Sequence, residues 1–392
     1  MNILMVHNYY QLPGGEDMVV ENEKNMLTRH GHKVVVYTRN NSELKDMGKV
    51  KKLSMVFSTV FSMKTYREIR KIIKDEKIDI INVHNTLSLI SPSVYYAGLS
   101  MKVPVFQTIH NFRLLCPAAT FYRNGHICEL CTTKGLLCSI KNKCYRGSRF
   151  QSFASAVILW FHRMTGVYKK INYICLTDFN RQKLLKGIKG LKENRVFVKP
   201  NFTAAPDKEE SLMGDYYLYA GRLEKIKGTD IMLKAWKHMK DDGITPKLII
   251  CGTGDLKEKA EKYVTKNGLD NVEFKGFVEN HVLKKMMRDA RAVILPTQWY
   301  EGFPVSIAES YSMGTPVITG DVGNAGDLVK DGITGLKYTY NSHEDLAEAI
   351  LKMEKTGDAK YREMRSEVRD TYDRLYNEET NYKILCEIYG IR

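Results

Sequence analysis

The chain has 392 residues, 43% of them hydrophobic, and a mean hydropathy of −0.34, which describes a soluble globular protein longer than one core usually supports. No run of about 18 uncharged apolar residues occurs, so the sequence predicts no membrane-spanning helix. The formal charge of the chain is +15, and its positive charge comes from residues 1–200, which contain 32 Lys and Arg against 13 Asp and Glu. This half is therefore expected to meet an anionic partner: a membrane surface, a lipid phosphate or a nucleic acid.

Short apolar strands alternate with helical stretches, which predicts parallel α/β layers. The first half is expected to hold strands at Ile3–Val6, Lys33–Tyr37, Ile78–Val83, Val105–Ile109, Tyr173–Leu176 and Val196–Val198. The second half is expected to hold strands at Tyr216–Ala220, Lys247–Cys251, Val272–Phe274, Ala292–Leu295 and Pro316–Thr319. A boundary near Pro200 predicts two doubly wound domains, 1–200 and 201–372, which face each other across a cleft and bind ligands at the carboxyl ends of their strands.

The first residues, MNILMVHNYY, are predicted to form a core strand and not a signal peptide, because they have neither a basic leading segment nor a cleavage site. The turn Leu12–Glu16 follows this strand and precedes a helix. Its adjacent glycines, Gly14 and Gly15, would let backbone N–H groups approach a phosphate closely. An ordinary strand-to-helix turn is the alternative.

Two stretches of the basic half, Leu53–Lys77 and Phe150–Lys170, combine apolar residues with cations. The cations of the first stretch are Lys64, Arg67, Arg70, Lys71, Lys74 and Lys77, and those of the second include Arg163, Lys169 and Lys170. Apolar residues with flanking cations suit a helix that lies on anionic lipid. Half-buried helices with solvated charged faces are the alternative, but the charge of this half favours membrane contact.

His110 directly follows the predicted strand Val105–Ile109. A histidine at the carboxyl end of a strand is expected to face a ligand rather than the core, and it can donate or accept a hydrogen bond near neutral pH. His84 occupies a similar strand end.

Five of the eight cysteines fall in one insert after His110, at Cys116, Cys128, Cys131, Cys138 and Cys144. In a cytosolic setting, clustered thiols favour a structural metal such as zinc over disulfides. Because the insert has one C-x-x-C pair and an odd number of thiols, reduced or redox-active thiols are the alternative. In either case the insert, 116–144, is expected to shape the acceptor pocket.

Two cations of the second half border a turn. Arg222 comes just after the strand Tyr216–Ala220, and Lys227 comes just before a helix that is expected at Asp230–Met239 with Thr229 as its cap. A forked guanidinium and a point charge beside a backbone turn suit a diphosphate, although solvated loop charges would show the same pattern.

The segment from Trp299 to Gly335 is the most informative. Glu301 precedes a turn, and Pro304 is expected at the first position of a helix that ends near Gly314. The N-terminus of this helix, residues 302–305, predicts an anion site. Glu309 lies about one turn further on and could accept hydrogen bonds from hydroxyls of the same ligand. An anion beside a polyol describes a nucleotide-sugar.

This segment reads E-G-F-P-x-x-x-x-E and is followed by G-T-P-V-I, G-N-A-G-D and D-G-x-T-G. It resembles the E-x7-E signature of the retaining glycosyltransferases of family four, of the bacterial surface-polysaccharide type, which have a GT-B fold. The G-R-x-x-x-x-K-G turn and the G-G-x-E loop also match family motifs. The resemblance implies catalysis without a metal or another cofactor, and a final helix, 373–392, that packs back on the first domain.

The resemblance also implies roles for particular residues. His110 would lie at the reacting sugar, Glu301 would hold the hydroxyls of that sugar, and Glu309 would hold the ribose; His110 and Glu301 are therefore the expected catalytic residues. The expected donor-binding residues are Gly14, Gly15, Arg222, Lys227, Phe277, Val278, Gly302, Phe303, Pro304, Val305 and Glu309. The family favours UDP over GDP, and the residues themselves do not distinguish them.

The leading hypothesis is a retaining, metal-independent glycosyltransferase that moves a sugar from a nucleotide-sugar to a glycan or lipid-linked acceptor. It would work on the cytoplasmic face of the membrane, in the synthesis of lipopolysaccharide or capsule. A nucleotide-sugar epimerase on the same architecture is the second hypothesis. A basic nucleic-acid-binding protein is the third, but no recognised module or aromatic–basic signature is present, so no nucleic-acid partner is expected.

Overall fold

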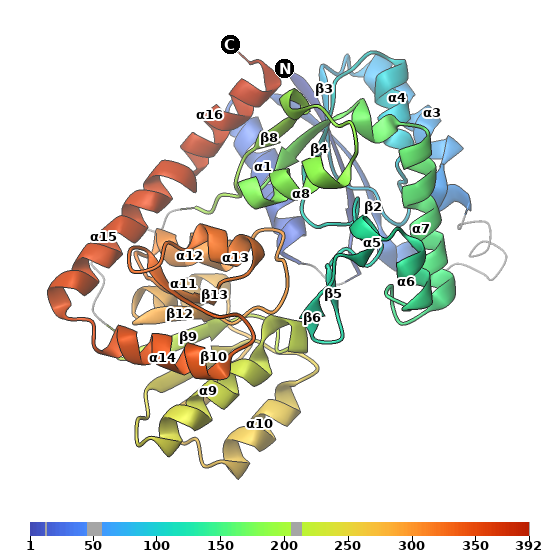
Figure 1. Ribbon diagram of the computed structural model, residues 1–392. Helices are drawn as coiled ribbons and strands as arrows, with labels where there is room; N and C mark the ends of the chain where they lie inside the picture. Colours follow the sequence, from blue (N-terminus) through green and yellow to red (C-terminus); the bar gives the residue numbers. More distant parts are fainter. Residues whose placement is uncertain (12–13, 45–56, 205–213, 392) are drawn as a thin grey trace. The chain divides into compact units, whose positions relative to one another are not determined.

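The computed structural model describes residues 1–11, 14–44, 57–204 and 214–391 (Figure 1). Leu12 and Pro13 of the predicted glycine turn, residues 53–56 of the first amphipathic stretch and residues 205–211 of the polar stretch after Pro200 lie outside the described residues. The chain forms two compact units. Unit 1 comprises Met1–Phe121, Cys128–Pro200 and Asn381–Arg392, and unit 2 comprises Tyr122–Ile127 and Asn201–Thr380.

Within the described residues, unit 1 has a parallel sheet of six strands in the order β2-β1-β3-β4-β7-β8. The strands are β1 (Asn2–Tyr9), β2 (Lys33–Asn40), β3 (Ile80–Asn85), β4 (Val105–Ile109), β7 (Asn172–Cys175) and β8 (Val196–Val198). The helices are α1 (Gly15–Arg29), α3 (Met63–Asp75), α4 (Ser93–Ser100), α5 (Leu130–Thr133), α6 (Leu137–Lys141), α7 (Arg149–Met164) and α8 (Asp178–Gly187). The strand order switches direction between β1 and β3, which is where such sheets bind ligands.

The described part of unit 2 has a second parallel sheet of six strands, in the order β11-β10-β9-β12-β13-β14. The strands are β9 (Tyr216–Ala220), β10 (Lys247–Cys251), β11 (Val272–Gly276), β12 (Ala292–Leu295), β13 (Val317–Gly320) and β14 (Gly335–Tyr338). The helices are α9 (Thr229–Asp241), α10 (Lys257–Lys266), α11 (Asn280–Arg288), α12 (Val305–Ser312), α13 (Gly323–Leu328), α14 (His343–Glu354) and α15 (Asp358–Leu375). This is the Rossmann order, with its switch between β9 and β12. The prediction of two doubly wound α/β domains is confirmed.

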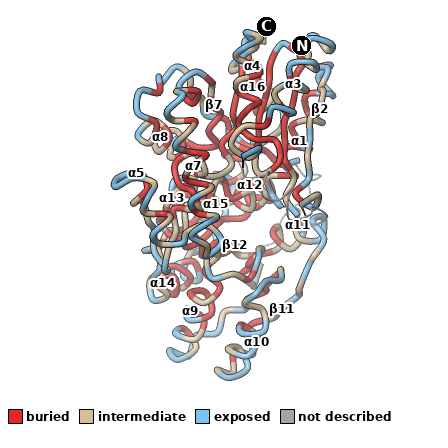
Figure 2. Tube along the Cα trace, turned by 90° about the vertical axis from the view of Figure 1, so that its right-hand side faces the viewer, coloured by how far each residue is buried: buried red, intermediate tan, exposed pale blue. Residues whose placement is uncertain are grey.

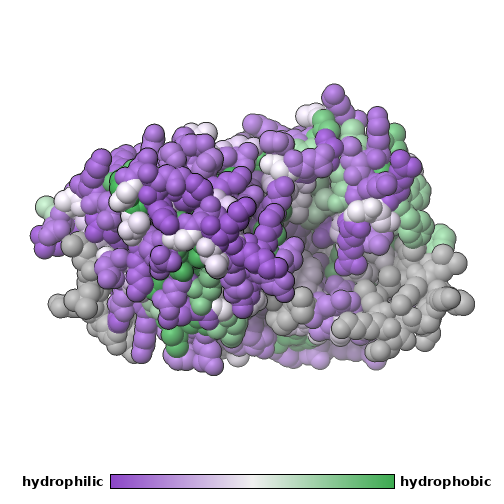
Figure 3. Space-filling view, turned by 90° about the horizontal axis from the view of Figure 1, so that it is seen from below, coloured by the Kyte–Doolittle hydropathy of each residue, from purple (hydrophilic) through white to green (hydrophobic). Residues whose placement is uncertain are grey.

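The cores of both units follow the strands. Figure 2 shows buried residues along the strands and exposed residues on the solvent side of the helices. In the face seen in Figure 3, hydrophilic side chains cover most of the surface and hydrophobic ones form smaller areas. Apolar burial is the main favourable term in folding, so these strand residues stabilise each domain most.

Two strands, β1 and β3, extend past their predicted carboxyl ends through residues that are polar and nevertheless mostly buried. β1 continues to Tyr9 through His7 and Asn8, which are both 0% exposed, and β3 continues to Asn85. Two other strands, β5 (Tyr122–Arg123) and β6 (His126–Ile127), form an antiparallel pair inside the cysteine insert, and their residues group with unit 2. β14 was absent from the predicted strands.

Two predicted helix starts are wrong. Gly228, with φ of +78°, is the N-cap of α9, so Thr229 is its first residue rather than its cap. Pro304 is the N-cap of α12, which begins at Val305, so it is not the first helical residue. Glycine is favoured at the N-cap of α9 because this position has a positive φ, which residues with a Cβ tolerate poorly.

The end of the chain is helical, with α16 at Glu378–Tyr389 after a break from α15. Its residues from Asn381 onward belong to unit 1. Tyr382 stacks on His30 with ring centroids 3.6 Å apart, and Asn381 Nδ2 donates to the carbonyl of Pro200 at 2.7 Å. The last helix is therefore part of the packing of unit 1.

His162 of α7 is fully buried between two partners in unit 1. Its Nε2 donates to the carbonyl of Val60 at 2.9 Å, and its Nδ1 lies 2.9 Å from the hydroxyl of Tyr96. Because a carbonyl can only accept, the proton is on Nε2 and the Tyr96 hydroxyl donates to Nδ1. Burial lowers the pKa of His162 from 6.5 to about 4, because it removes the water that would solvate the charged ring, and the hydrogen bond to the Val60 carbonyl opposes this only in part.

Acid is expected to destabilise unit 1 through this residue. The unfolded chain binds a proton at His162 below pH 6.5, whereas the folded chain does so only near pH 4, so stability falls as the pH drops through this window. From pH 7 to pH 5 the loss at His162 is about 2 kcal/mol. His162→Gln, whose amide can make both contacts without titrating, should lose less stability over this range in urea unfolding. The same substitution at exposed His281 is the control; an unchanged pH dependence in His162→Gln would contradict the assignment.

Candidate functional site

In unit 2 the predicted donor residues lie around the switch between β9 and β12. Lys227 follows β9, and Glu301 follows β12. Lys227 Nζ donates to Glu301 Oε1 at 2.6 Å, and Thr297 Oγ1 donates to the same oxygen at 2.9 Å. Glu301 is 6% exposed, so this carboxylate is held by a cation and a hydroxyl inside the domain. The structure thus brings together two residues 74 positions apart that were predicted to serve one ligand.

The turn that carries Lys227 needs a glycine next to it. A Cβ built on Gly228 would lie 1.8 Å from the carbonyl oxygen of Pro296, and the φ of Gly228 is +78°. No side chain fits this close approach between the loops after β9 and β12. Gly228 therefore allows Lys227 to reach Glu301.

Trp299 forms another wall of this site. Lys227 Nζ lies 5.5 Å from the centroid of its ring, an arrangement that favours the cation. The buried Nε1 of Trp299 has no hydrogen-bond partner among the described residues, although an indole N–H almost always finds one. Within the described part of the chain it remains a buried, unsatisfied donor on a ring that lies beside Lys227.

The N-terminus of α12 closely follows Glu301 in sequence, and a side chain of α13 holds the turn between them. Asn324 of α13 donates from Nδ2 to the carbonyl of Gly302 at 2.7 Å and also to that of Glu301. The Phe303 ring is 8% exposed and packs against Tyr376 with centroids 5.8 Å apart. Phe303 and Pro304 are both buried and Pro304 has no N–H, so the first backbone N–H of the helix that could meet a ligand is that of Val305. The first N–H groups of a helix suit such a contact with an anion.

Glu309 lies one turn into α12 and has a different environment from Glu301. Asn280 Nδ2 lies 3.5 Å from its Oε1, at the limit of a hydrogen bond. Burial raises the pKa of Glu309 above its ordinary value, and the charge of Lys284 and the Asn280 contact oppose this change. The structure records no contact between Glu309 and Glu301 among the described residues, so each carboxylate has its own neighbours.

Two of the remaining donor candidates of unit 2, Arg222 and Phe277, are exposed. Arg222 NH1 pairs with Glu224 Oε1 at 2.7 Å, and the Arg222 side chain is 69% exposed. Phe277, which follows β11, is 81% exposed, an unusual state for a large aromatic ring. Val278 beside it is half-buried. The recorded side-chain partner of Arg222 is thus Glu224 and not a member of the Lys227–Glu301 pair. The Phe277 ring is open to a ligand.

In unit 1, His110 lies at the end of β4 and contacts His84 at the end of β3. His84 Nδ1 and His110 Nε2 are 2.9 Å apart. Both rings line a cavity of ≈ 50 Å³ together with Asn111, Arg113 and Tyr168, among others. Burial lowers the pKa of both imidazoles well below the ordinary value, and for His110 the neighbouring His84 adds to this effect. Both histidines are therefore neutral at neutral pH.

Gly14 and Gly15 are exposed at the N-terminus of α1, after the first strand. Among the described residues, a Cβ built on either glycine meets nothing within 4 Å, and Gly14 has a φ of −136° that any residue adopts. The packing of the protein therefore does not require glycine at these positions. A ligand that approaches the backbone closely would require it.

The five cysteines of the insert all carry free thiols. Burial raises the pKa of Cys131 to about 12, and the nearby Cys116, Cys144, Cys138 and Cys128 raise it further. Across the described ranges, which include all five, no three His, Cys, Asp or Glu side chains converge closely enough to hold a metal ion. The arrangement does not fit a structural zinc ion, and we propose no metal here.

Two family models match consecutive parts of the chain. Glycosyltransferase Family 4 matches residues 13–203, and Glycosyl transferases group 1 matches residues 202–371. The chain belongs to glycosyltransferase family 4. It therefore has the GT-B fold expected from the resemblance.

Two relatives of this glycosyltransferase match different shares of its length. An uncharacterized glycosyltransferase of Methanocaldococcus jannaschii is 27% identical over 360 residues, which are 90% of this chain and 88% of that protein. The lipopolysaccharide 1,6-galactosyltransferase of Salmonella typhimurium is 27% identical over 208 residues, 50% of this chain and 54% of that protein. The crystal structure of Anabaena HepE in complex with UDP has a TM-score of 0.69 at 16% identity and covers 100% of both chains, a likeness that concerns the fold.

Sequence reasoning missed several residues around the predicted ones in this glycosyltransferase. The Lys227–Glu301 pair is held or bordered by three such residues, Thr297, Trp299 and Asn324. Their part in the site is visible only from the contacts that they make between loops. The position of Thr297 and Trp299 directly after β12, at the strand order's switch, was the available signal.

Proposed function

We propose that this glycosyltransferase binds a nucleotide-sugar through unit 2 and transfers its sugar without a catalytic metal. The observation that carries the proposal is the Lys227–Glu301 pair at the switch between β9 and β12. Lys227 and the first N–H groups of α12 would neutralise the leaving diphosphate, a task that needs fixed positive groups where charge develops. Glu301, Glu309 and His110 would contact the hydroxyls of the donor, as the family resemblance implies.

UDP is the proposed nucleotide. HepE, which shares the fold, binds UDP in its crystal structure. The exposed Phe277 ring follows β11, beside the end of β10, and offers a flat apolar face to a base. Gly14 and Gly15 of unit 1 would approach the donor phosphates with their backbone N–H groups.

Retention of the anomeric configuration is proposed from the family resemblance. The acceptor is proposed to be a glycan or a lipid-linked sugar of a surface polysaccharide, in keeping with the Salmonella lipopolysaccharide 1,6-galactosyltransferase among the relatives.

We further propose that unit 1 contacts an anionic membrane on its cytoplasmic face. The exposed side chains of α7 include Phe150, Phe153, Trp160 and Met164, at 53–70% exposure and at spacings that place them along one face of the helix. The opposite face of α7 is buried. An exposed apolar face on a basic domain suits the boundary of an anionic bilayer.

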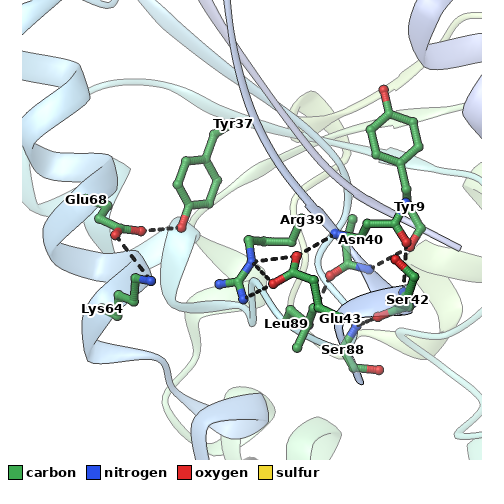
Figure 4. A network of polar contacts seen from close by, with 12 residues as sticks. Tyr9, Tyr37, Arg39, Asn40, Ser42, Glu43, Lys64, Glu68, Ser88 and Leu89 are labelled. Atoms are coloured by element: carbon green, nitrogen blue, oxygen red, sulfur yellow. Dashed lines mark hydrogen bonds and ion pairs between the residues drawn. The ribbon is translucent and has the colours of Figure 1, made fainter. Parts of the chain in front are cut away.

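Helix α3, also in unit 1, supplies cations. It buries Thr65, Ile69 and Ile73, while Lys64, Arg67, Arg70, Lys71 and Lys74 are exposed. Ile69 and Ile73 therefore pack inward, as in the alternative for this stretch, whereas Met63 at the start of the helix is 51% exposed. Lys64 points toward Glu68, 3.8 Å away, which also accepts from Tyr37 at 2.6 Å (Figure 4). Within the described ranges, no helix is both long and apolar enough to cross a bilayer.

The donor proposal is tested with thermal shifts across UDP-, GDP- and dTDP-sugars. A bound donor stabilises the native state by about 2.7 kcal/mol at a concentration one hundred times its Kd, so the matching nucleotide should raise the Tm most, and EDTA should leave the shift intact. Product analysis by NMR then reads the linkage, which should be retained. Stabilisation by no nucleotide-sugar would overturn the proposal, and conversion of the donor without an acceptor would favour an epimerase.

A further inference from the structure

A series of buried polar side chains leads through unit 1 to His110. It begins at Glu23 of α1, which is fully buried. Oε2 of Glu23 lies 2.9 Å from Nζ of Lys199. Lys199 is 1% exposed, forms this ion pair and donates a hydrogen bond to Oδ1 of Asn381 at 2.8 Å. A carboxylate paired with an ammonium group can only accept hydrogen bonds, so its neighbours must donate to it.

Asn82 of β3 takes its orientation from this carboxylate. Its Nδ2 lies 2.6 Å from Glu23 Oε1, and its Oδ1 accepts from Thr108 Oγ1 at 3.1 Å. The reversed amide would set two acceptor oxygens 2.6 Å apart, which the ion pair does not allow. Asn82 therefore directs its second N–H toward Nε2 of His84, 3.2 Å away.

That N–H determines the tautomer of His84. Glu23 Oε1 lies 3.6 Å from the same Nε2, beyond hydrogen-bond distance, whereas the Asn82 N–H is within it. Nε2 is therefore the bare, accepting nitrogen, and the ring proton of His84 is on Nδ1. This proton points at His110 Nε2, 2.9 Å away, where one proton fits between the two rings. His110 Nε2 therefore accepts, and His110 carries its own proton on Nδ1.

The electrostatic surroundings keep both rings neutral. Burial is the largest influence that lowers the pKa of His84 and of His110, and His7 and Lys199 lower it further. Glu23 acts in the opposite direction on His110 but does not outweigh burial. A neutral imidazole with a fixed proton is a directional donor rather than a charge.

We propose that His84 is a positioning residue that holds His110 as the Nδ1–H tautomer, so that His110 offers a hydrogen-bond donor to an oxygen of the donor sugar. The inference rests on the proposed function, in which His110 lies at the reacting sugar. An isolated neutral imidazole favours the Nε2–H tautomer, so the network selects the less common one. The ≈ 50 Å³ cavity beside the rings is too small for a sugar and has room for a hydroxyl or a water.

Two variants of similar length separate positioning from packing. In His84→Gln the amide oxygen can accept from Asn82 while the amide N–H donates to His110, so the polarity is kept. In His84→Met both hydrogen bonds are lost. The tautomer is read from the ¹⁵N shifts of the ring nitrogens in histidine-labelled protein, with His110 identified by its absence in His110→Asn.

The wild type and His84→Gln should show His110 protonated on Nδ1, and His84→Met should shift it toward Nε2. We expect kcat/KM to fall roughly three- to tenfold in His84→Met, the effect of one neutral hydrogen bond, and to change less than twofold in His84→Gln. Stabilisation by UDP, which we assign mainly to unit 2, should be equal in all three proteins.

A wild-type His110 protonated on Nε2 would overturn the inference. A tautomer that changes in His84→Met without any change in kcat/KM would overturn the role of His110 toward the sugar. If His84→Met fails to fold, the wild type and His84→Gln still give the tautomer and the rate. If the wild type transfers no sugar, the proposed function fails while the ¹⁵N spectrum still reports the tautomer.

Discussion

Lys227→Ala is expected to lower kcat/KM roughly 30- to 1,000-fold, which corresponds to about 2–4 kcal/mol of transition-state stabilisation. The variant removes the cation proposed to meet the leaving diphosphate. It also leaves the buried carboxylate of Glu301, now 2.6 Å from Lys227 Nζ, with Thr297 as its remaining recorded side-chain partner among the described residues. Because both effects act on the same site, the loss should appear mainly in turnover with a nucleotide-sugar.

Lys225 provides a matched control for this variant. It lies two residues earlier on the same turn and is exposed, and the structure records no pairing between it and Glu301 among the described residues. Lys225→Ala should therefore retain nearly all activity. Arg222→Ala tests the other predicted cation, whose present partner is Glu224. Wild-type kcat/KM in Lys227→Ala would sink the assignment of the donor site.

Apolar periodicity predicted most of the fold because strand cores are made of apolar residues. The bounds of β9, β10 and β12 agree with the predicted strands. Predictions failed where tertiary contacts override local preference. Gly228 caps α9 because a carbonyl of another loop approaches it, which no local pattern reveals. β1 and β3 continue through buried histidines and asparagines that look like loop residues in the sequence.

The candidate site was predicted in part because parallel strands end at one edge of a sheet. This rule placed Lys227 and Glu301 near one ligand, and the structure joins them. It could not show that Glu23, Asn82 and Lys199 support His110, because these residues come from α1, from β3 and from the end of β8. Their pairing depends on how the elements pack, and a buried polar residue has no distinct sequence pattern.

The two amphipathic stretches show how one composition permits two structures. Both combine apolar residues with cations, and the sequence left membrane contact and half-burial open for each. α3 buries Ile69 and Ile73 and exposes only Met63 among its large aliphatic residues as far as the structure describes them, whereas α7 leaves a row of apolar side chains exposed along one face. Their three-dimensional context decides between the two, because a helix shows lipid only the face that its own domain leaves uncovered.

Replacing Lys64, Arg67, Arg70, Lys71 and Lys74 with glutamine is expected to weaken binding to anionic vesicles by up to about 5 kcal/mol at low salt, at about 1 kcal/mol for each cation near the surface. The true loss should be smaller, because Lys64 lies near Glu68 and Arg70 stacks on Tyr66. Binding by the wild type should also fall as ionic strength rises, since salt screens exposed charges. Stabilisation by a nucleotide-sugar should not change.

Trp160 reports the contact directly. It is 57% exposed on the apolar face of α7, so its fluorescence should shift to the blue when that face enters a bilayer, whereas Trp236 is fully buried and should not respond. A matched control replaces Lys257, Lys259, Lys262 and Lys266 of α10 in unit 2 with glutamine, which should leave vesicle binding nearly intact. If the wild type ignores anionic vesicles even at low salt, the positive charge of residues 1–200 serves another partner. An acceptor free in solution then becomes the better proposal, because a lipid-linked acceptor requires the enzyme to reach the membrane surface.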